Sequence, residues 1–244
     1  MEKLNKQGKL IVIEGSDGSG KATQTRKLFD RLSDLEGNKV RRLSFPNYES
    51  ESSAIIRMYL RGDFGGTAEE VNPYAAATFY AIDRYASYFD WKDFYKNGGI
   101  VLSDRYVESN MVYQAAKLSK KGERTKFLTW IEDLEYNRYG LPRADLTIFL
   151  DMPPDVSAIL RKKRGRDDIH ESDALYMKKI YATYKELAKK YDWKVVECAE
   201  GNFVRNSTDI FEDILPLVEE ILLRPEKKEE TSDRQEDLRR SIFD

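Results

Sequence analysis

Short apolar segments alternate with longer amphipathic segments along most of the chain. The apolar segments are rich in leucine and β-branched residues and have the length of buried parallel strands; they are residues 10–13, 39–43, 100–102, 146–150 and 193–196. After the first of them, Leu28, Leu32 and Leu35 recur at helical spacing, and Gly37 follows where a helix would end. The alternation predicts an α/β fold: a five-stranded, doubly wound parallel sheet with helices on both faces.

Helical spacing returns late in the chain, at Ile180, Tyr184, Leu187 and Tyr191. Two segments depart from the pattern. Residues 161–173 (RKKRGRDDIHESD) are densely charged and lie between two helical patterns, which on composition alone favours a solvated loop. Residues 224–244 are nearly all charged or polar, so we expect a disordered or loosely helical tail. The sequence therefore predicts a single domain over residues 1–223, followed by this tail.

Composition excludes several classes of protein. With one cysteine and one histidine in 244 residues, the chain can form neither a disulfide framework nor a His- or Cys-rich zinc site. A net charge of -2 argues against general nucleic-acid binding. No segment approaches the ~20 apolar residues of a membrane span, and the first nine residues lack the apolar centre of a signal peptide. We expect a soluble cytoplasmic protein with neither membrane nor nucleic-acid partners.

A glycine-rich segment directly follows the first predicted strand and opens the first predicted helix. This strand–GxxxxGK–helix context is typical of a phosphate-binding loop, in which backbone N–H groups and the helix N-terminus converge on phosphate oxygens. The lysine adds a point charge for the β- and γ-phosphates of a nucleotide. The predicted ATP-binding residues are Gly15, Ser16, Asp17, Gly18, Ser19, Gly20, Lys21, Ala22 and Thr23.

One position of this loop departs from the usual pattern. The residue after the lysine is commonly a Ser or Thr whose hydroxyl binds Mg²⁺, and here it is Ala22. Thr23 is one residue too late to replace it. We therefore expect Mg²⁺ to depend more on water, nucleotide oxygens and carboxylates, with Asp17 as the nearest candidate.

Other residues distinguish among phosphate-binding proteins. A guanine-specific switch would need Asn-Lys-x-Asp, whereas residues 38–41 read NKVR. A hydrolysing ATPase commonly ends a strand in Asp-Glu, with the Glu activating water. Here Asp104 is followed by Arg105, and Asp151 by Met152. Transfer of a phosphoryl group to a substrate is favoured over hydrolysis.

Five motifs together resemble the thymidylate kinase family of nucleoside monophosphate kinases, over about residues 8–222. They are residues 14–24 (EGSDGSGKATQ), 45–48 (FPNY), 80–84 (YAIDR), 104–113 (DRYVESNMVY) and the basic segment from Arg161. The resemblance implies the phosphate-binding-loop NTPase fold, with residues 161–173 as a small lid. It also implies transfer of the ATP γ-phosphoryl group to dTMP, with Mg²⁺, and a homodimer.

The resemblance assigns roles to residues of this chain. It implies that Arg105 holds the acceptor phosphate and that Asp17 contacts the sugar or Mg²⁺ nearby. Lys21, Arg164 and Arg166 would supply transition-state charge, although the sequence does not rank the lid arginines Arg161, Arg164 and Arg166. The implied dTMP-binding residues are Asp17, Phe45, Pro46, Tyr48, Tyr80, Arg84, Arg105, Ser109, Asn110 and Tyr113, and the metal candidates are Asp17, Asp104 and Glu171.

Some assignments have structural alternatives. Tyr80 and Arg84 share a helix face at i and i+4, so Tyr80 could stack on the base beside Arg84 or fill the core with its aromatic neighbours. Tyr113 could exclude a ribose hydroxyl or simply pack its helix onto the sheet. Glu171 and Asp168 could equally belong to a solvated loop, and His170 has no assigned role.

Two other functions share parts of the pattern. A deoxynucleoside kinase has the same loop but needs a carboxylate base for a neutral hydroxyl acceptor. An acceptor phosphate is already an anion, and the sequence offers Arg105 and Tyr48 for it. A nucleotide-dependent switch without an acceptor is supported by the phosphate-binding loop alone.

Overall fold

The computed structural model describes residues 8–36, 39–162 and 174–223, with the backbone alone at 159–162. Its centre is a five-stranded parallel sheet in the order β2-β3-β1-β4-β5. The strands are β1 (Lys9–Glu14), β2 (Val40–Ser44), β3 (Ile100–Asp104), β4 (Leu146–Asp151) and β5 (Lys194–Glu197). The α/β class, the five strands and their parallel arrangement are confirmed, with ends that differ by only a few residues.

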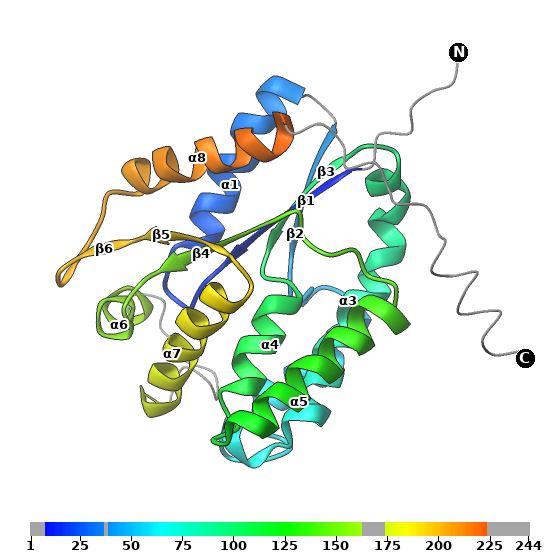
Figure 1. Ribbon diagram of the computed structural model, residues 1–244. Helices are drawn as coiled ribbons and strands as arrows, with labels where there is room; N and C mark the ends of the chain where they lie inside the picture. Colours follow the sequence, from blue (N-terminus) through cyan, green and yellow to red (C-terminus); the bar gives the residue numbers. More distant parts are fainter. Residues whose placement is uncertain (1–7, 37–38, 163–173, 224–244) are drawn as a thin grey trace, which may run out of the picture.

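Helices cover both faces of the sheet (Figure 1). On one face, α1 (Lys21–Glu36) and α8 (Ser207–Leu223) pack on inward-facing residues such as Ile11 and Ile148. On the other face lie α3 (Pro73–Lys96), α4 (Val107–Ala115), α5 (Lys121–Glu132) and α7 (Ala174–Lys190). Along β1, Leu10 and Val12 pack in one core and Ile11 and Ile13 in the other, which is why residues 10–13 are all apolar.

Shorter elements complete the described part of the chain. They are α2 (Ala54–Leu60), α6 (Pro154–Lys162), the 3₁₀ turns η2 (Glu51–Ser53) and η3 (Ala68–Glu70), the π-helical turn η4 (Asp133–Arg138), and a hairpin of β6 (Ala199–Glu200) and β7 (Phe203–Val204). The start of α3 is capped by Asn72, whose side chain accepts hydrogen bonds from the N–H groups of Tyr74 and Ala75, and Pro73 occupies the first turn. Each described helix is too short or too polar to cross a membrane.

The helical periodicities are confirmed with two differences. Leu28 and Leu32 are buried, but Leu35 is 56% exposed because it lies at the edge of the face that α1 presents to the sheet. Ile180, Tyr184 and Leu187 are buried on α7, whereas Tyr191 lies just beyond the end of that helix. The proposed cap Gly37, the lid residues 163–173 and the tail 224–244 lie outside the described residues.

The strand order brings three loops to one edge of the sheet. The chain leaves β1 toward β2 on one side and later crosses to β4 on the other side. In such sheets ligands bind at the carboxyl ends of the strands where the winding changes direction. The loops after β1, β2 and β3 meet at this edge.

Candidate active site

The loop between β1 and α1 has the backbone geometry that its glycines predict. Gly15 has φ +153°, and a Cβ placed on it would lie 2.6 Å from Ser19 Oγ and 3.1 Å from the Leu150 carbonyl oxygen. Gly20 has φ +89°, in the left-handed region that favours glycine. The loop closes with a hydrogen bond from the Ser19 N–H to the Ser16 carbonyl, 3.1 Å long. A side chain at Gly15 would collide with the loop itself, whereas one at Gly20 would have space but an unfavourable φ.

Lys21 lies inside this loop rather than on the surface. Its side chain is 7% exposed, and Nζ donates a 2.9 Å hydrogen bond to the Ser16 carbonyl. Burial, and secondarily the nearby Arg105 guanidinium, lower the pKa of Lys21 from 10.5 to about 8. A buried cation held by one carbonyl gains more than an exposed one from an added anion, because little water competes for it.

Three buried hydroxyls around the loop have no hydrogen-bond partner among the described residues: Ser16 Oγ, Ser19 Oγ and Thr25 Oγ1. Buried polar groups are normally paired, so unpaired ones mark places where a ligand or water completes the site. Ala22 and Thr23 are exposed, which agrees with the expectation that Thr23 does not replace the missing hydroxyl. Thr25, one turn further into α1, was missed by the sequence analysis.

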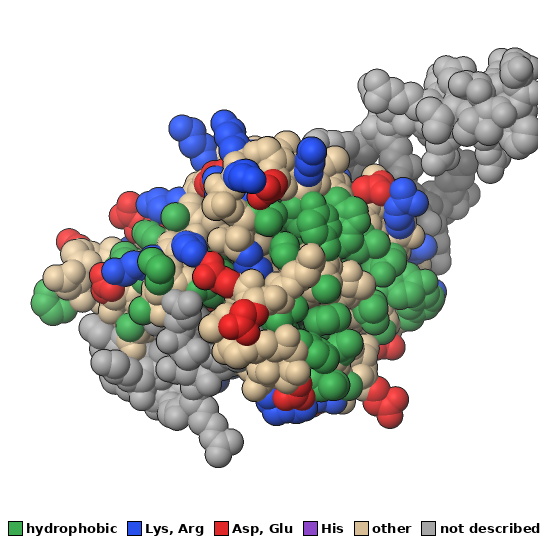
Figure 2. All heavy atoms as spheres, turned by 90° about the horizontal axis from the view of Figure 1, so that it is seen from below, with side chains coloured by type: hydrophobic (Ala, Val, Ile, Leu, Met, Phe, Trp, Pro, Cys, Tyr) green, Lys and Arg blue, Asp and Glu red, His purple; other side chains and the backbone are tan. Residues whose placement is uncertain are grey.

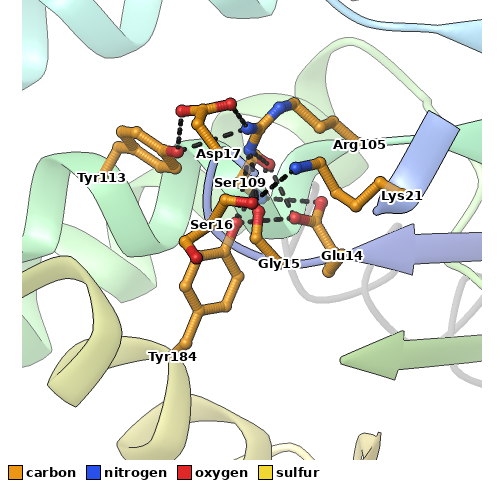
Figure 3. Close-up of polar contacts among 9 residues, drawn as sticks. All are labelled: Glu14, Gly15, Ser16, Asp17, Lys21, Arg105, Ser109, Tyr113 and Tyr184. Atoms are coloured by element: carbon orange, nitrogen blue, oxygen red, sulfur yellow. Dashed lines mark hydrogen bonds and ion pairs between the residues drawn. The ribbon is translucent and has the colours of Figure 1, made fainter. Parts of the chain in front are cut away.

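Arg105 links the phosphate-binding loop to a neighbouring cavity (Figure 3). Its backbone has φ +69°, unusual for a residue other than glycine and typical of strained functional positions. Nη1 donates to the Gly15 carbonyl at 3.3 Å and to Ser109 Oγ at 3.0 Å, and Nη2 forms an ion pair with Asp17. Tyr113 donates a 2.7 Å hydrogen bond to the other oxygen of Asp17. The structure therefore brings Asp17, Arg105 and Tyr113 into direct contact.

Glu14 helps to hold Arg105 in place through Ser109. Its carboxylate is fully buried at the end of β1 and accepts from the N–H groups of Tyr106 and Ser109 at 2.9 and 3.1 Å. It also accepts from the hydroxyls of Ser109 at 2.6 Å and Tyr184 at 2.8 Å. Ser109, predicted to bind dTMP, is thus occupied in joining Glu14 to Arg105 (Figure 3). The signal for Glu14 was available: it is a charged residue that follows four apolar ones and directly precedes the glycine loop.

The cavity beside Arg105 collects most of the remaining predicted residues. Its lining includes Asp17, Phe45, Pro46, Tyr48, Tyr80, Arg84, Arg105, Ser109, Asn110 and Tyr113, together with Gln114, which was not predicted. Tyr80 contacts Tyr59 edge-on, with ring centroids 6.2 Å apart. Tyr80 therefore packs against the core and also lines the cavity, and its stacking on a base stays a prediction.

Two arginines in different surroundings line the cavity. Arg105 and Asp17 lie at the end next to the phosphate-binding loop. Arg84, which also lines the cavity, is 2% exposed and forms a two-pronged ion pair with the buried Glu135. Burial would by itself lower the pKa of Arg84, but the Glu135 carboxylate more than offsets this and the pKa lies above its usual value. Arg84 therefore remains charged, and a ligand with an anionic group at one end and a polar planar group at the other would suit the cavity.

The turn after β2 also lines the cavity. Phe45 is buried against Tyr106, with ring centroids 6.0 Å apart, and Tyr48 is 51% exposed at the rim. Asp83 holds this turn, because its carboxylate accepts from the Asn47 N–H at 2.8 Å and from the Ser52 hydroxyl at 2.6 Å. Asp83 was noted in the sequence beside Arg84, and its structural role is to anchor the cavity wall.

The family model for thymidylate kinases matches residues 13–210 of the chain. The chain belongs to the thymidylate kinase family. It is 34% identical over 188 residues to the thymidylate kinase of Mycobacterium tuberculosis, covering 73% of this chain and 85% of that one. It is 30% identical over 222 residues to the thymidylate kinase of Plasmodium falciparum, covering 91% and 95%. Membership makes the protein a nucleoside monophosphate kinase that acts on small molecules.

A solved structure agrees with this assignment at the level of the fold. The thymidylate kinase of Candida albicans superposes with a TM-score of 0.67 at 22% identity, covering 88% of this chain and 92% of that one. Similarity of this kind confirms the phosphate-binding-loop NTPase fold of the kinase.

The described residues offer a divalent cation only sparse protein ligands. They contain no group of three His, Cys, Asp or Glu side chains arranged to hold a metal. Asp17 contacts Arg105 and Tyr113, and Asp104 ends β3 close enough to Lys21 to oppose part of the lowering of the pKa of that lysine. This donor set fits Mg²⁺, which usually takes one or two carboxylates and obtains its other ligands from phosphates and water.

Three predicted residues of the kinase have no described position. Arg164, Arg166 and Glu171 lie outside the described residues, as do Asp168 and His170, so their roles remain predictions. Arg161 lies in the last turn of α6, where the backbone alone is described.

Gln114 is the clearest cavity residue that sequence analysis missed. It is fully buried, and neither its side-chain nitrogen nor its oxygen has a hydrogen-bond partner among the described residues. It follows Tyr113 on α4, a helix whose residues are buried on nearly every side. Such burial of an amide is costly without a partner, so Gln114 marks a place where a ligand or water completes the site.

Proposed function

We propose that the protein transfers the γ-phosphoryl group of ATP to dTMP, giving dTDP and ADP, with Mg²⁺ as cofactor. The observation that best supports this is the position of Arg105. Its guanidinium contacts the Gly15 carbonyl in the phosphate-binding loop and also lines the cavity. One cation thus joins the loop proposed for the donor phosphates to the cavity proposed for the acceptor, and phosphoryl transfer needs positive charge where the two meet.

The residues of the chain have separable roles in this reaction. Lys21 and the loop N–H groups hold the donor phosphates, and Arg105 holds the acceptor phosphate and neutralises charge as the group moves. The acceptor oxygen is already anionic, so no general base is needed. Mg²⁺, held by Asp17 or Asp104 together with phosphates and water, would withdraw charge from the transferring group. Arg164 and Arg166 are proposed to add positive charge from the lid.

Base and sugar are proposed to occupy the opposite end of the cavity. Arg84 and Asn110 would form hydrogen bonds with the polar edge of thymine, and Tyr80 would contact its ring. Tyr113 would lie against the 2′ carbon of the sugar. Its hydroxyl is held by Asp17, and burial raises the pKa of Tyr113 well above its usual value, so it stays protonated. A ring fixed in this way leaves little room for a ribose hydroxyl.

A coupled assay of ADP release across deoxy- and ribonucleoside monophosphates, with thymidine included, tests the proposal. We expect the highest kcat/KM with dTMP and little ATP consumption without an acceptor. Preference for thymidine would instead support a deoxynucleoside kinase. Steady ATP hydrolysis without any acceptor would support a nucleotide-dependent switch.

We also propose that the kinase is a homodimer joined through α3. Ile82, Tyr85 and Phe89 lie on one side of this helix and are 43%, 39% and 53% exposed. Figure 2 shows hydrophobic side chains gathered on the face seen from below, on the right of the view, where Figure 1 places α3 and α5. Exposed apolar patches of this kind are typical of interfaces.

Ile82→Glu combined with Phe89→Glu should convert the dimer into a monomer. Two carboxylates facing their own copies across a two-fold axis would be buried without partners, which strongly opposes association. Light scattering coupled to size-exclusion chromatography gives the mass directly. As a matched control, Leu223→Glu changes a residue that is 82% exposed at the end of α8 and should leave the mass unchanged. A wild-type monomer at micromolar concentration would contradict the proposal.

A further inference from the structure

A π-helical turn places a carboxylate directly behind the cavity. After α5, residues Asp133–Arg138 widen into a π turn, in which the Tyr139 N–H reaches the Leu134 carbonyl at 3.0 Å. Glu135 is the buried residue of this turn, and its side chain is fully inaccessible. Single π turns inside helices are costly and are frequent at functional sites. In this π turn the side chain of Glu135 points toward α3 and α4.

Glu135 holds one edge of the Arg84 guanidinium. Nε and Nη2 of Arg84 donate to its two carboxylate oxygens, each at 2.5 Å. Nη1 makes no hydrogen bond to any residue that the structure describes, while Arg84 lines the cavity. The planar guanidinium cannot rotate while two of its nitrogens are fixed. Glu135 thereby leaves Nη1 as the nitrogen available to a ligand.

The same carboxylate orients Asn110. The amide nitrogen donates to Glu135 Oε1 and to the Ala77 carbonyl, both at 3.0 Å. Turning the amide over would set its oxygen against these two acceptors, which is unfavourable. The oxygen Oδ1 is buried and has no hydrogen-bond partner among the described residues. Asn110 can therefore offer a ligand only an acceptor.

We propose that Glu135 is a positioning residue that determines base selectivity by fixing a donor, Arg84 Nη1, beside an acceptor, Asn110 Oδ1. This inference rests on the proposed function. A base edge that suits this pair carries a carbonyl next to an N–H group, as in thymine and uracil. The corresponding edge of cytosine carries an amino group next to an unprotonated nitrogen, which reverses both roles. Glu135 acts through its two neighbours and does not touch the base.

Glu135→Gln tests this at constant side-chain volume. The amide replaces one of the two carboxylate oxygens of Glu135 with an N–H donor. The guanidinium of Arg84 then loses one of its two hydrogen bonds to residue 135, and the amide of Asn110 can turn over. We expect the ratio of kcat/KM for dTMP to that for dCMP to fall at least about 10-fold, the size expected from a mismatched buried hydrogen bond. kcat/KM for dUMP should fall in parallel with that for dTMP, because the two bases share this edge. The KM for ATP should stay unchanged.

Glu108→Gln is the matched control. Glu108 is also a buried glutamate, on α4, but it does not line this cavity, and burial and the nearby Glu14 raise its pKa to about 8. It is therefore protonated at neutral pH, and the amide resembles it closely. The dTMP-to-dCMP ratio should not change.

A purely structural role for Glu135 predicts equal losses with dTMP, dUMP and dCMP and a lower melting temperature, and that result overturns the proposal. If Glu135→Gln gives no folded protein, the double variant Arg84→Met, Glu135→Met replaces the ion pair with apolar side chains of similar length. An unchanged dTMP-to-dCMP ratio in that variant also overturns it. A wild-type enzyme that does not prefer dTMP would refute the proposed function itself, before any variant is compared.

Discussion

Lys21→Met is expected to lower kcat by at least about 10²-fold without lowering the melting temperature. The lysine offers its charge to phosphates whose negative charge shifts during transfer, and preorganised contacts of this type are worth about 3 kcal/mol or more. The charge is also buried: among the described residues Nζ donates a hydrogen bond only to the Ser16 carbonyl, and burial lowers the pKa of Lys21 to about 8. Removing it therefore relieves a desolvation cost in the folded protein. Steady-state kinetics and thermal melting measure the two effects separately.

The pH dependence of the wild type gives an independent measurement. Because burial lowers the pKa of Lys21 from its usual 10.5 to about 8, the free enzyme loses this charge as the pH rises through about 8. kcat/KM for ATP reports the free enzyme and should fall over that range, and Lys21→Met should lack this decline.

Lys117→Met serves as the control for Lys21→Met. Lys117 is another buried lysine, with a pKa that burial lowers to about 7, and it donates to the Tyr59 hydroxyl and the Val71 carbonyl, away from the phosphate-binding loop. Its removal should change kcat less than about 10-fold. Near-normal turnover in a folded Lys21→Met protein would refute the assignment of the phosphate-binding loop.

The fold was largely predictable because its determinants are local in sequence. Buried parallel strands are continuously apolar, so β1 and β4 stand out, and the glycines of residues 15–20 require backbone angles that other residues avoid. The phosphate-binding loop follows from the same local signals. The strand order could not be obtained this way, since it depends on which segments pack together.

Site residues were predictable where the residue type itself indicates the role, as a cation does for a phosphate. Lys21 and Arg105 are cations beside a predicted ligand edge, and the structure places both there. The role of Glu135 could not be predicted, because its position depends on a π turn that has no recognisable sequence pattern. Gln114 was missed because a buried amide resembles its apolar neighbours until its unpaired atoms are seen.

Arg105→Lys is expected to lower kcat/KM for dTMP by about 10²–10³-fold while changing the KM for ATP little. An arginine presents two parallel N–H groups to two oxygens of one phosphate, whereas a lysine acts as a single point charge. The loss of one preorganised donor at a developing charge typically has this size. In addition, Arg105 Nη1 and Nη2 are spread over Gly15, Ser109 and Asp17, a set that one ammonium group cannot reach at once.

The expected effect of Arg105→Lys on dTMP but not on ATP makes this prediction specific. The Glu14 carboxylate is held by the N–H and hydroxyl of Ser109, which Arg105→Lys leaves intact, so the donor site should persist. Arg143→Lys is the matched control, because Arg143 pairs with Glu132 at 3.1 Å outside this cavity and should tolerate the change. If Arg105→Lys raised the KM for ATP as much as that for dTMP, Arg105 would serve the phosphate-binding loop as a whole and would not specifically hold the acceptor phosphate.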